Sequence, residues 1–391
     1  MNRVIVLCNN YEENNFPKEP DDENRFFTYG FGSSFGKLIN SYMTGYEVEV
    51  WRIDRYCNDK YYSKTVNGIK YRVFRSTPVY KLGDYSGNFL KEIKKENRTS
   101  SPVFLIVHTN TWQTYQILFS LKEARIVTTH HGDWSPFFLL HNSSLIRRMK
   151  AILGIIAEKI TFRYVKFFLI CDIHQVSYIA KSAPKMKYAI FSTGLDVSKF
   201  KSISKEEARK ELGLEQNKKY ILYVGKMYKY KQVDKLIEIW KEIKKTKPEV
   251  ELLIVGNESK ENWGEEYYDL ALSSGAKIIG RVLNIELYKY YSAADVYVLM
   301  ALRKDYFGGP GIAPLESLAC NVPVVSFSLI NYLGDNVEEI GEVPETEEQY
   351  RDAIIKVLDY PGRYKNMRES IMKFYSLEVS AGRLDKILKS I

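Results

Sequence analysis

Two lysines and a glycine near the middle of the chain form a pattern that suits binding of a diphosphate. Gly225 ends an apolar run typical of a β-strand, Lys226 follows it directly, and Lys231 comes six residues after the glycine, near the start of a helical pattern. Glycine lets the backbone approach a ligand closely, and lysines add full charge to the partial positive charge of a helix amino end. Read alone, the segment could also be a loop with surface lysines.

A second candidate segment is rich in glycine and proline and leads into a helix expected to begin near Pro314. The loop before that helix contains Asp305, Gly308, Gly309, Pro310, Gly311 and Ile312. Backbone N–H groups in such a loop can hold an anion. Glu316 falls in the first turn of the helix, where its carboxylate could accept hydrogen bonds from two adjacent hydroxyls, as on a ribose. The helix dipole alone would also favour a glutamate at this position.

Two adjacent histidines, His130 and His131, end another strand-like run and are followed by Gly132. We predict that His131 hydrogen-bonds a substrate hydroxyl or acts as an acid or base, and that His130 is a turn histidine. His108, also at a strand end, is a weaker candidate of the same kind.

Residues 29–37 form a glycine-rich segment that contains Gly32 and Ser33 and precedes a helical pattern at 38–43. A glycine-rich turn that opens a helix is a further possible anion site. The segment is not the dinucleotide-binding fingerprint, because it does not directly follow the first strand. It is not a Walker A loop either, because Leu38 stands where a hydroxyl would bind magnesium.

The elements that must position these residues are short apolar runs alternating with helical patterns. The runs are 3–8, 47–51, 103–108, 126–130, 167–171, 188–191, 220–225, 251–256, 277–280, 296–300 and 322–327. Such alternation predicts βα units and parallel sheets, whose ligands bind at the carboxyl ends of the strands.

A polar, charge-rich stretch between about residues 194 and 219 interrupts the runs. We therefore predict an α/β fold of two Rossmann-like lobes with parallel sheets that face a cleft. Residues 1–197 form the first lobe, 198–375 form the second lobe, and 376–391 form a helix that packs back on the first lobe.

Composition restricts the class of protein. The 391 residues carry a formal net charge of +9, which suits an anionic partner: nucleic acid, anionic lipid or a phosphorylated small molecule. No nucleic-acid-binding motif is present, so we expect no nucleic-acid partner. The cysteines, at positions 8, 57, 171 and 320, have neither CxxC spacing nor nearby histidines, so we expect no metal and no disulfide framework. With no signal-peptide pattern, the expected location is the cytoplasm.

The most biased charge distribution lies between residues 145 and 166. Arg147, Arg148, Lys150, Lys159, Arg163 and Lys166 alternate with apolar residues, and Glu158 is the one acid among them. One interpretation is an amphipathic helix that caps a core. The other is a helix that rests on anionic lipid headgroups, as a peripheral protein of the inner membrane face would.

The order and spacing of these segments resemble the nucleotide-sugar glycosyltransferases with the GT-B fold, and most closely the retaining family 4, glycosyl transferases group 1. Matching motifs in the second half are Gly225, Lys226 and Lys231; Val255-Gly256; Gly280-Arg281-Val282; Ala294-Asp295-Val296; Gly308 to Ser317; and Pro323 to Val325. The first half matches more loosely, at Gly30 to Ser34, His131-Gly132, Gly194, Asp196 and Phe200.

The resemblance implies transfer of a hexose-type sugar from a nucleotide-sugar donor to a saccharide or lipid-linked acceptor, with retention and with neither metal nor cofactor. The resemblance implies that Lys226 and Lys231, beside Gly225, bind the diphosphate and that Glu316 binds the ribose. It implies that the backbone of residues 309–312 and of Gly32 and Ser33 contacts the phosphates and the sugar. It also implies that His131 contacts the transferred sugar and that the region near Arg281 borders the base.

The chain departs from the family pattern at several positions, which include Gln232 in place of a glycine and Ser192-Thr193 in place of an asparagine, and two further departures bear directly on the site. Gly308 stands where the family has a first glutamate, so Asp305 becomes the candidate for contact with the sugar. Lys226 stands where an arginine is usual, which keeps the charge but loses the bidentate geometry. Two alternatives stay open: a catalytically impaired partner subunit that binds sugar nucleotides, and a nucleotide-sugar epimerase.

Overall fold

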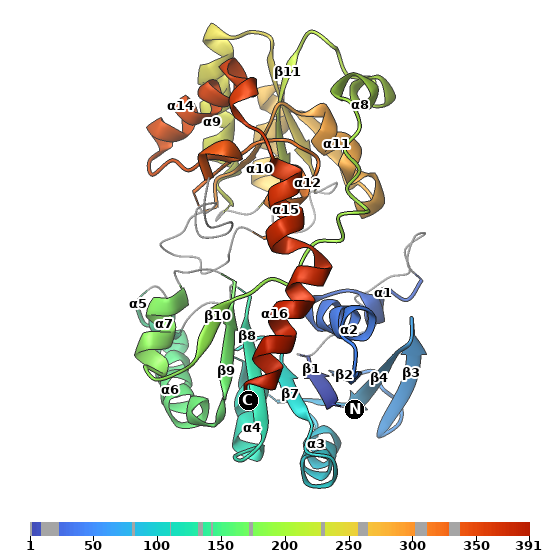
Figure 1. Ribbon diagram of the computed structural model, residues 1–391. Coiled ribbons are helices and arrows are strands. Elements are labelled where there is room, and N and C mark those ends of the chain that lie inside the picture. Colours follow the sequence, from blue (N-terminus) through green and yellow to red (C-terminus); the bar gives the residue numbers. More distant parts are fainter. Residues whose placement is uncertain are drawn as a thin grey trace. The chain divides into compact units, whose positions relative to one another are not determined.

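The computed structural model describes residues 2–8, 23–79, 83–109, 111–131, 136–141, 144–171, 175–227, 231–256, 265–301, 311–327 and 337–391. The chain divides into two compact units (Figure 1). Unit 1 is Met1–Thr193 with Leu377–Ile391, and unit 2 is Gly194–Ser376. Each unit is built on a mainly parallel sheet, which confirms the predicted α/β fold class.

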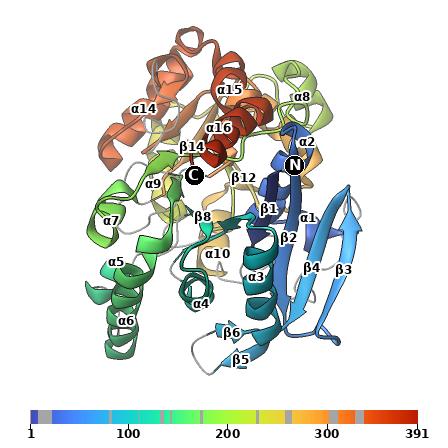
Figure 2. The ribbon, with the colours of Figure 1, turned by 60° about the horizontal axis from the view of Figure 1, so that its bottom comes forward.

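Unit 1 contains an eight-stranded sheet of order β10-β9-β8-β7-β1-β2-β4-β3, parallel except for β3 against β4. Its strands are β1 (Asn2–Leu7), β2 (Tyr46–Asp54), β3 (Tyr61–Val66), β4 (Ile69–Arg75), β7 (Val103–Ile106), β8 (Arg125–His130), β9 (Phe167–Ile170) and β10 (Tyr188–Ile190). A separate pair, β5 (Thr77–Val79) and β6 (Gly83–Tyr85), is antiparallel (Figure 2).

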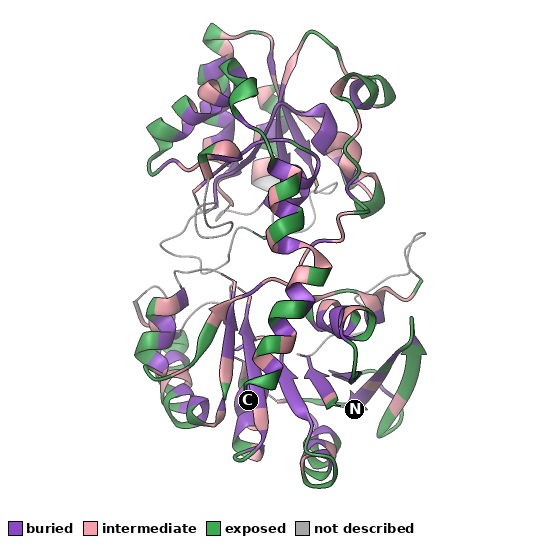
Figure 3. Cartoon of the chain, viewed as in Figure 1, coloured by how far each residue is buried: buried purple, intermediate pink, exposed green. Residues whose placement is uncertain are grey.

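Helices cover both faces of this sheet, and β1 shows why. Val4 and Val6 face a core shared with α2 (Phe31–Tyr42) and α16 (Leu377–Lys389). Ile5 and Leu7 face a second core shared with α3 (Gly87–Thr99), α4 (Trp112–Ser120) and α7 (Gln175–Ser182). Because successive side chains alternate between faces, a strand buried on both sides must be apolar throughout, as Figure 3 shows for the central strands.

The remaining helices of unit 1 are α1 (Arg25–Thr28), α5 (Pro136–His141), α6 (Leu145–Thr161) and η2 (Phe162–Tyr164). The last helix of the chain, α16, returns to unit 1 and packs against α2. Tyr46 of β2 donates a hydrogen bond to Asp385 of α16 at 2.9 Å, and Leu384 is fully buried in the shared core.

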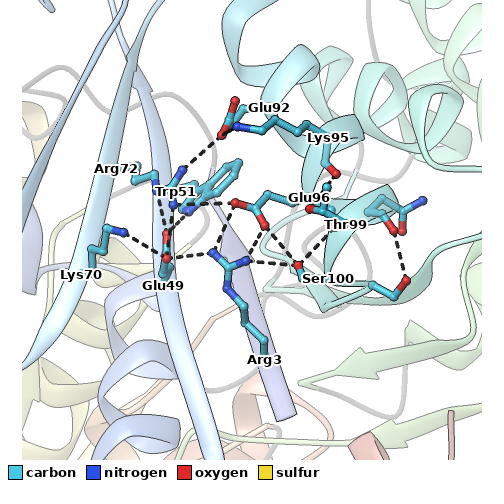
Figure 4. A network of polar contacts seen from close by, with 12 residues as sticks. Arg3, Glu49, Trp51, Lys70, Arg72, Glu92, Lys95, Glu96, Thr99 and Ser100 are labelled. Atoms are coloured by element: carbon cyan, nitrogen blue, oxygen red, sulfur yellow. Dashed lines mark hydrogen bonds and ion pairs between the residues drawn. The ribbon is translucent and has the colours of Figure 1, made fainter. Parts of the chain in front are cut away.

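A network of paired charges links β1, β2 and β4 to α3 (Figure 4). Arg3 donates to Glu49 at 2.9 Å and pairs with Glu96, while Arg72 contacts Glu49 at 2.8 Å. Trp51 Nε1 donates to the same Glu49 at 2.8 Å. Nearly buried charges are tolerated when each has an opposite partner and further hydrogen bonds. Since Arg3 lies at the amino end of β1, this network supports the sheet rather than the edge where ligands bind.

Unit 2 contains a six-stranded parallel sheet of order β13-β12-β11-β14-β15-β16. Its strands are β11 (Lys219–Val224), β12 (Val250–Val255), β13 (Lys277–Gly280), β14 (Val296–Leu299), β15 (Val324–Ser326) and β16 (Gly341–Glu342). The helices are α8 (Lys205–Glu211), α9 (Val233–Thr246), α10 (Glu265–Ser274), η4 (Asn284–Glu286), α11 (Leu287–Ala293), α12 (Ala313–Ala319), η5 (Val337–Glu339), α14 (Glu347–Asp359), η6 (Pro361–Arg363) and α15 (Met367–Tyr375). The order reverses between β11 and β14, and that switch point is where sheets of this type bind ligands.

Asp295, in the Ala-Asp-Val motif, ties together the start of the unit 2 sheet. Its carboxylate accepts hydrogen bonds from Arg209 Nη2, Lys205 Nζ and the backbone N–H of Tyr220, each at 2.7 Å. Asp295 and Arg209 are both buried, so their pairing fixes α8 against β11 and β14. The motif is therefore explained by structure, not by contact with a substrate.

Candidate functional site

Three adjacent strands of unit 2 lead into glycines whose backbones lie close together. Gly225 donates to Val255 O at 2.9 Å, and Gly256 donates to Gly280 O at 2.7 Å. Gly256 has a φ of 123°, and a Cβ there would lie closer than 3.0 Å to the Gly225 carbonyl oxygen. Only glycine fits at Gly256, and the carboxyl edge of β11, β12 and β13 is thereby lined with backbone that a ligand can approach closely.

The two predicted lysines lie between β11 and α9, and residues 228–230 between them are outside the described part. Lys226 is exposed, and its carbonyl accepts a 2.8 Å hydrogen bond from Tyr223 Oη, which fixes the turn after β11. Lys231 is partly buried, and burial lowers its pKa to about 8. Desolvation disfavours the ammonium, so a bound anion would restore its full charge.

Glu316 is buried in α12 and not on the surface. It is 4% exposed, and its Oε2 accepts a 2.7 Å hydrogen bond from Tyr291 Oη. Burial raises its pKa to about 7. A glutamate placed only to match the helix dipole would be exposed and ionised, so its burial favours a more specific role.

The loop before α12 is only partly described. Gly311, with a φ of 76°, and Ile312 are exposed, and the helix begins at Ala313, close to the predicted start at Pro314. The predicted contacts Asp305 and Gly309, together with Gly308, lie outside the described residues.

The switch point of unit 2 brings the predicted residues to one edge of the sheet. β11 and β14 are neighbours, Gly225 and Lys226 follow β11, and the segment from Gly311 to Glu316 follows β14. Arg281 is exposed and follows β13, the edge strand, at the same carboxyl edge. A crevice at this position is the usual ligand site of an open parallel sheet.

His131, directly after β8 of unit 1, is held in one orientation by its neighbours. Its Nε2 lies 2.8 Å from Thr129 Oγ1, and the Phe31 ring stacks on the imidazole at 3.6 Å. The His108 ring lies edge-on to the His131 imidazole, with 5.2 Å between the ring centroids. The backbone of His108 is left-handed, with a φ of 70°. Burial, with the nearby histidines, lowers the pKa of His131 well below its ordinary value. A neutral imidazole at physiological pH favours hydrogen bonding over proton donation.

The glycine-rich segment of unit 1 is not the loop that the sequence analysis predicts, because α2 begins at Phe31, well before residue 38. Gly30, with a φ of 91°, precedes the helix. A Cβ at Gly32 would collide with Cys8 Sγ, and one at Gly36 would lie 2.7 Å from Val50 Cγ2. These two glycines therefore allow close helix–sheet packing.

Ser33 already uses its hydroxyl within unit 1. Its Oγ donates to Phe27 O, lies 3.1 Å from Tyr29 O, and accepts from Arg52 Nη2 at 2.6 Å. A ligand would therefore meet Ser33 through its backbone. The N–H groups of the first helical turn, which includes Gly32 and Ser33, have no partner within the helix.

Sequence reasoning missed Arg52, the residue that holds this turn in place. Arg52 lies on β2 with 0% exposure and donates to Phe26 O, to Tyr29 O at 3.0 Å and to Ser33 Oγ. The available signal was an arginine in the otherwise apolar end of β2, where a charge must find buried acceptors.

Comparison with known proteins shows which family unit 2 is similar to. Residues 204–374 match the family described as Glycosyl transferases group 1. Over this range unit 2 is similar to the group 1 glycosyltransferases. The predicted residues Lys226, Lys231, Arg281 and Glu316 lie within this matched range, whereas His131 lies outside it.

Curated relatives align with about half of the chain. D-inositol 3-phosphate glycosyltransferase from Segniliparus rotundus is 26% identical over 206 residues, which are 50% of this chain and 44% of the relative. The GDP-mannose-dependent monoacylated alpha-(1-6)-phosphatidylinositol monomannoside mannosyltransferase of Corynebacterium glutamicum is 27% identical over 210 residues, 51% of this chain and 55% of the relative. The chain thus spans about half the length of these curated relatives.

Solved structures resemble the chain over nearly its whole length. Sucrose-phosphate synthase from Thermosynechococcus elongatus has a TM-score of 0.72 at 16% identity, covering 99% of this chain and 98% of that one. Anabaena Alr3699/HepE in complex with UDP and glucose has a TM-score of 0.66 at 12% identity, covering 99% of both chains. At these identities the likeness shows the fold, which is GT-B.

Proposed function

We propose that the protein transfers a hexose-type sugar from a nucleotide-sugar donor to an acceptor hydroxyl, with retention of the anomeric configuration. The observation that carries the proposal is the switch point of unit 2, where close-packed glycine backbone and two lysines follow β11 and a buried carboxylate follows β14. The complex of the related fold Alr3699/HepE with UDP and glucose supports a nucleotide-sugar donor.

Lys226 and Lys231 would bind the donor diphosphate. Charge develops on the diphosphate as its bond to the anomeric carbon breaks, so fixed cations there stabilise the transition state more than the ground state. Lys231 is the more effective of the two because its partial burial weakens competition from water. We propose that these lysines and the glycine backbone suffice, without a metal ion or other cofactor.

Glu316 and His131 would orient the donor. Glu316 Oε2 accepts from Tyr291, and the Asn284 side chain also hydrogen-bonds the carboxylate, so both partners fix its orientation for contact with ribose hydroxyls. Arg281 and its neighbours would border the base. Neutral His131, stacked on Phe31, would hydrogen-bond the transferred sugar. The acceptor oxygen would attack the anomeric carbon from the face that the diphosphate leaves, and its proton would pass to the leaving phosphate oxygen.

The acceptor we propose is a saccharide or lipid-linked saccharide, reached by peripheral association with an anionic membrane on its inner face. The Corynebacterium relative is named for a phosphatidylinositol mannoside acceptor, which supports a lipid-linked substrate. Among the helices that the structure describes, none has the length and hydropathy needed to cross a bilayer.

The test is a thermal-shift screen with UDP-, GDP- and ADP-sugars, followed by a transfer assay with the donor that stabilises the protein. We expect Lys231→Ala and Lys226→Ala to lower kcat/KM by at least about a hundredfold, as loss of a transition-state charge contact does. Lys245→Ala, an exposed lysine on α9, is the matched control and should keep full activity. Proton NMR of the product should show the donor's anomeric configuration, and an inverted product would refute retention.

Gly308 favours one alternative, a catalytically impaired subunit that binds sugar nucleotides, because the family's first glutamate is missing there. Donor stabilisation without transfer or hydrolysis by the wild-type protein would support that alternative. Release of a free sugar epimer in the absence of an acceptor would identify an epimerase instead.

A further inference from the structure

Helix α6 points its large apolar side chains toward solvent and its small ones toward the core. Leu145 is 75% exposed and Leu153 63% exposed, and Ile146, Met149, Ile152, Ile156 and Ile160 are exposed as well. The side chains of α6 that are buried are Ala151, Ala157, Glu158 and Thr161. This is the reverse of the pattern in a helix that only caps a core, where the large apolar residues are the buried ones.

The exposed apolar residues form one continuous face. At 100° per residue they cover an arc of about 120° around the helix axis. Arg148 and Lys159 border this arc on one side and Lys150 borders it on the other. An apolar stripe between two cationic margins is the arrangement of a helix that lies in a lipid interface.

Glu158, the one acid in this helix, does not offset these charges, because it points inward. It is 0% exposed, and its carboxylate accepts hydrogen bonds from Tyr178 Oη at 2.7 Å, Ser182 Oγ at 2.8 Å and Tyr115 Oη at 3.2 Å. The outward surface of α6 is therefore purely apolar and cationic in character.

A cavity of about 590 Å³ adjoins the end of α6, and Lys159 belongs to both features. Five cationic residues line the cavity: Lys159, Arg163, Lys166, Lys185 and Lys187. Phe162, Val165 and Met186 contribute its apolar wall. In the described part of the chain, none of the five forms an ion pair with a carboxylate.

This cavity is distinct from the proposed donor site. Lys166 directly precedes β9 and Lys187 directly precedes β10, so the cavity lies at the amino ends of these parallel strands. His131 follows β8 at the opposite, carboxyl edge of the same sheet. The donor residues Lys226, Lys231 and Glu316 belong to unit 2.

We propose that the outward face of α6 and the adjoining cationic cavity form a docking surface for an anionic phospholipid bilayer. The apolar arc enters the boundary between headgroups and acyl chains, and the cavity takes a headgroup phosphate. These residues would carry the membrane association that is part of the proposed function. The docking surface itself does not depend on sugar transfer. A nucleic acid would need the cations but not the apolar arc, so a bilayer fits the combination better.

The experiment is co-sedimentation of the full chain with vesicles of phosphatidylcholine alone or with added phosphatidylglycerol. We expect binding only to the anionic vesicles, weakened by salt. Leu153→Glu should lower the partition coefficient about tenfold or more, because an inserted leucine is replaced by a charge that the lipid repels. The triple variant Lys166→Gln/Lys185→Gln/Lys187→Gln should lower it about fivefold for each charge removed.

Matched controls carry the same chemical changes elsewhere on unit 1. Phe119→Glu changes an exposed apolar residue of α4, and Lys91→Gln/Lys94→Gln/Lys95→Gln removes three exposed lysines of α3. These controls should sediment like wild type. All variants should keep the wild-type thermal shift with the donor, which separates failure of the docking surface from failure of the proposed function.

Several outcomes would overturn the proposal. The first is equal sedimentation with neutral and anionic vesicles, or anionic binding that Leu153→Glu and the triple variant leave unchanged. The second is a dimer in analytical ultracentrifugation that Leu153→Glu dissociates, which would make α6 an interface between copies of the chain. The third is stabilisation of the protein by free glycerol phosphate without vesicle binding, which would assign the cavity to a soluble anion.

Discussion

Gly256→Ala tests whether the close approach of backbone at the carboxyl edge of unit 2 forms the donor site. Gly256 has a φ of 123°, which side chains rarely allow, and its N–H donates to Gly280 O at 2.7 Å. An alanine Cβ would meet the Gly225 carbonyl oxygen, which would have to withdraw by more than half an ångström to reach the 3.0 Å that real Cβ atoms keep.

Two contributions set the size of the effect. An alanine held at this φ costs of order 1–3 kcal/mol. Displacement of Gly225, which precedes Lys226, moves backbone that we propose to contact the diphosphate. A misplacement near 1 Å lowers catalysis by about a hundredfold, so we expect a tenfold to hundredfold loss in kcat/KM besides a lower melting temperature.

Gly213→Ala and Gly275→Ala are the matched controls. Both glycines lie in unit 2 with positive φ, 65° and 83°, but a Cβ on either would meet nothing within 4 Å. They should lose about 1–2 kcal/mol of stability and keep wild-type affinity for the nucleoside diphosphate by calorimetry. If Gly256→Ala binds as tightly as these controls, the glycine edge does not hold the donor and the reasoning is refuted.

Three further predictions concern charges. Affinity for the nucleoside diphosphate should fall as pH rises through about 8, because Lys231 then loses its proton. Calorimetric titrations across that pH range should show no such decline for Lys231→Arg, because arginine stays charged. Asp295→Asn should destabilise unit 2 by about 3–5 kcal/mol in urea unfolding, because it leaves Arg209 buried without its counterion; a loss no larger than that of Lys205→Ala would contradict this. Arg52→Met should destabilise unit 1 by about 2–4 kcal/mol and raise KM for the donor, because the backbone acceptors and Ser33 lose their donor. Arg52→Lys should restore part of the stability and part of the change in KM. An unchanged KM in Arg52→Met would limit Arg52 to a structural role.

Several features of the fold followed from local patterns in the sequence. The apolar run that ends at Gly225 became β11, and the helical pattern that begins near Lys231 became α9, in which Val233, Leu236 and Trp240 are buried. Periodicity and turn residues act over a few positions, so they can be read directly. The hairpin of β3 and β4 was missed although its turn, Asn67 with a φ of 51° and Gly68 with a φ of 76°, is a strong hairpin signal.

Other features depended on which distant residues pack together. The sequence placed Glu316 at a helix start, but its burial under Tyr291 and its raised pKa required the packing of α11 against α12. The same holds for Ser33, whose hydroxyl is occupied by an arginine 19 positions away in the chain. Desolvation and hydrogen bonding of a side chain are set by its surroundings, so no local pattern predicts them.

The contrast is clearest in α6 and in the glycines of α2. Sequence alone determined that α6 is both basic and apolar, but only the tertiary structure decided that Glu158 and the small residues turn inward and the large apolar residues outward. Sequence alone identified the glycines near residue 32, but only the sheet beneath them shows that they permit close packing against Cys8. Residue type limits what a position can do, whereas the neighbours that folding brings to it determine which of those possibilities is realised.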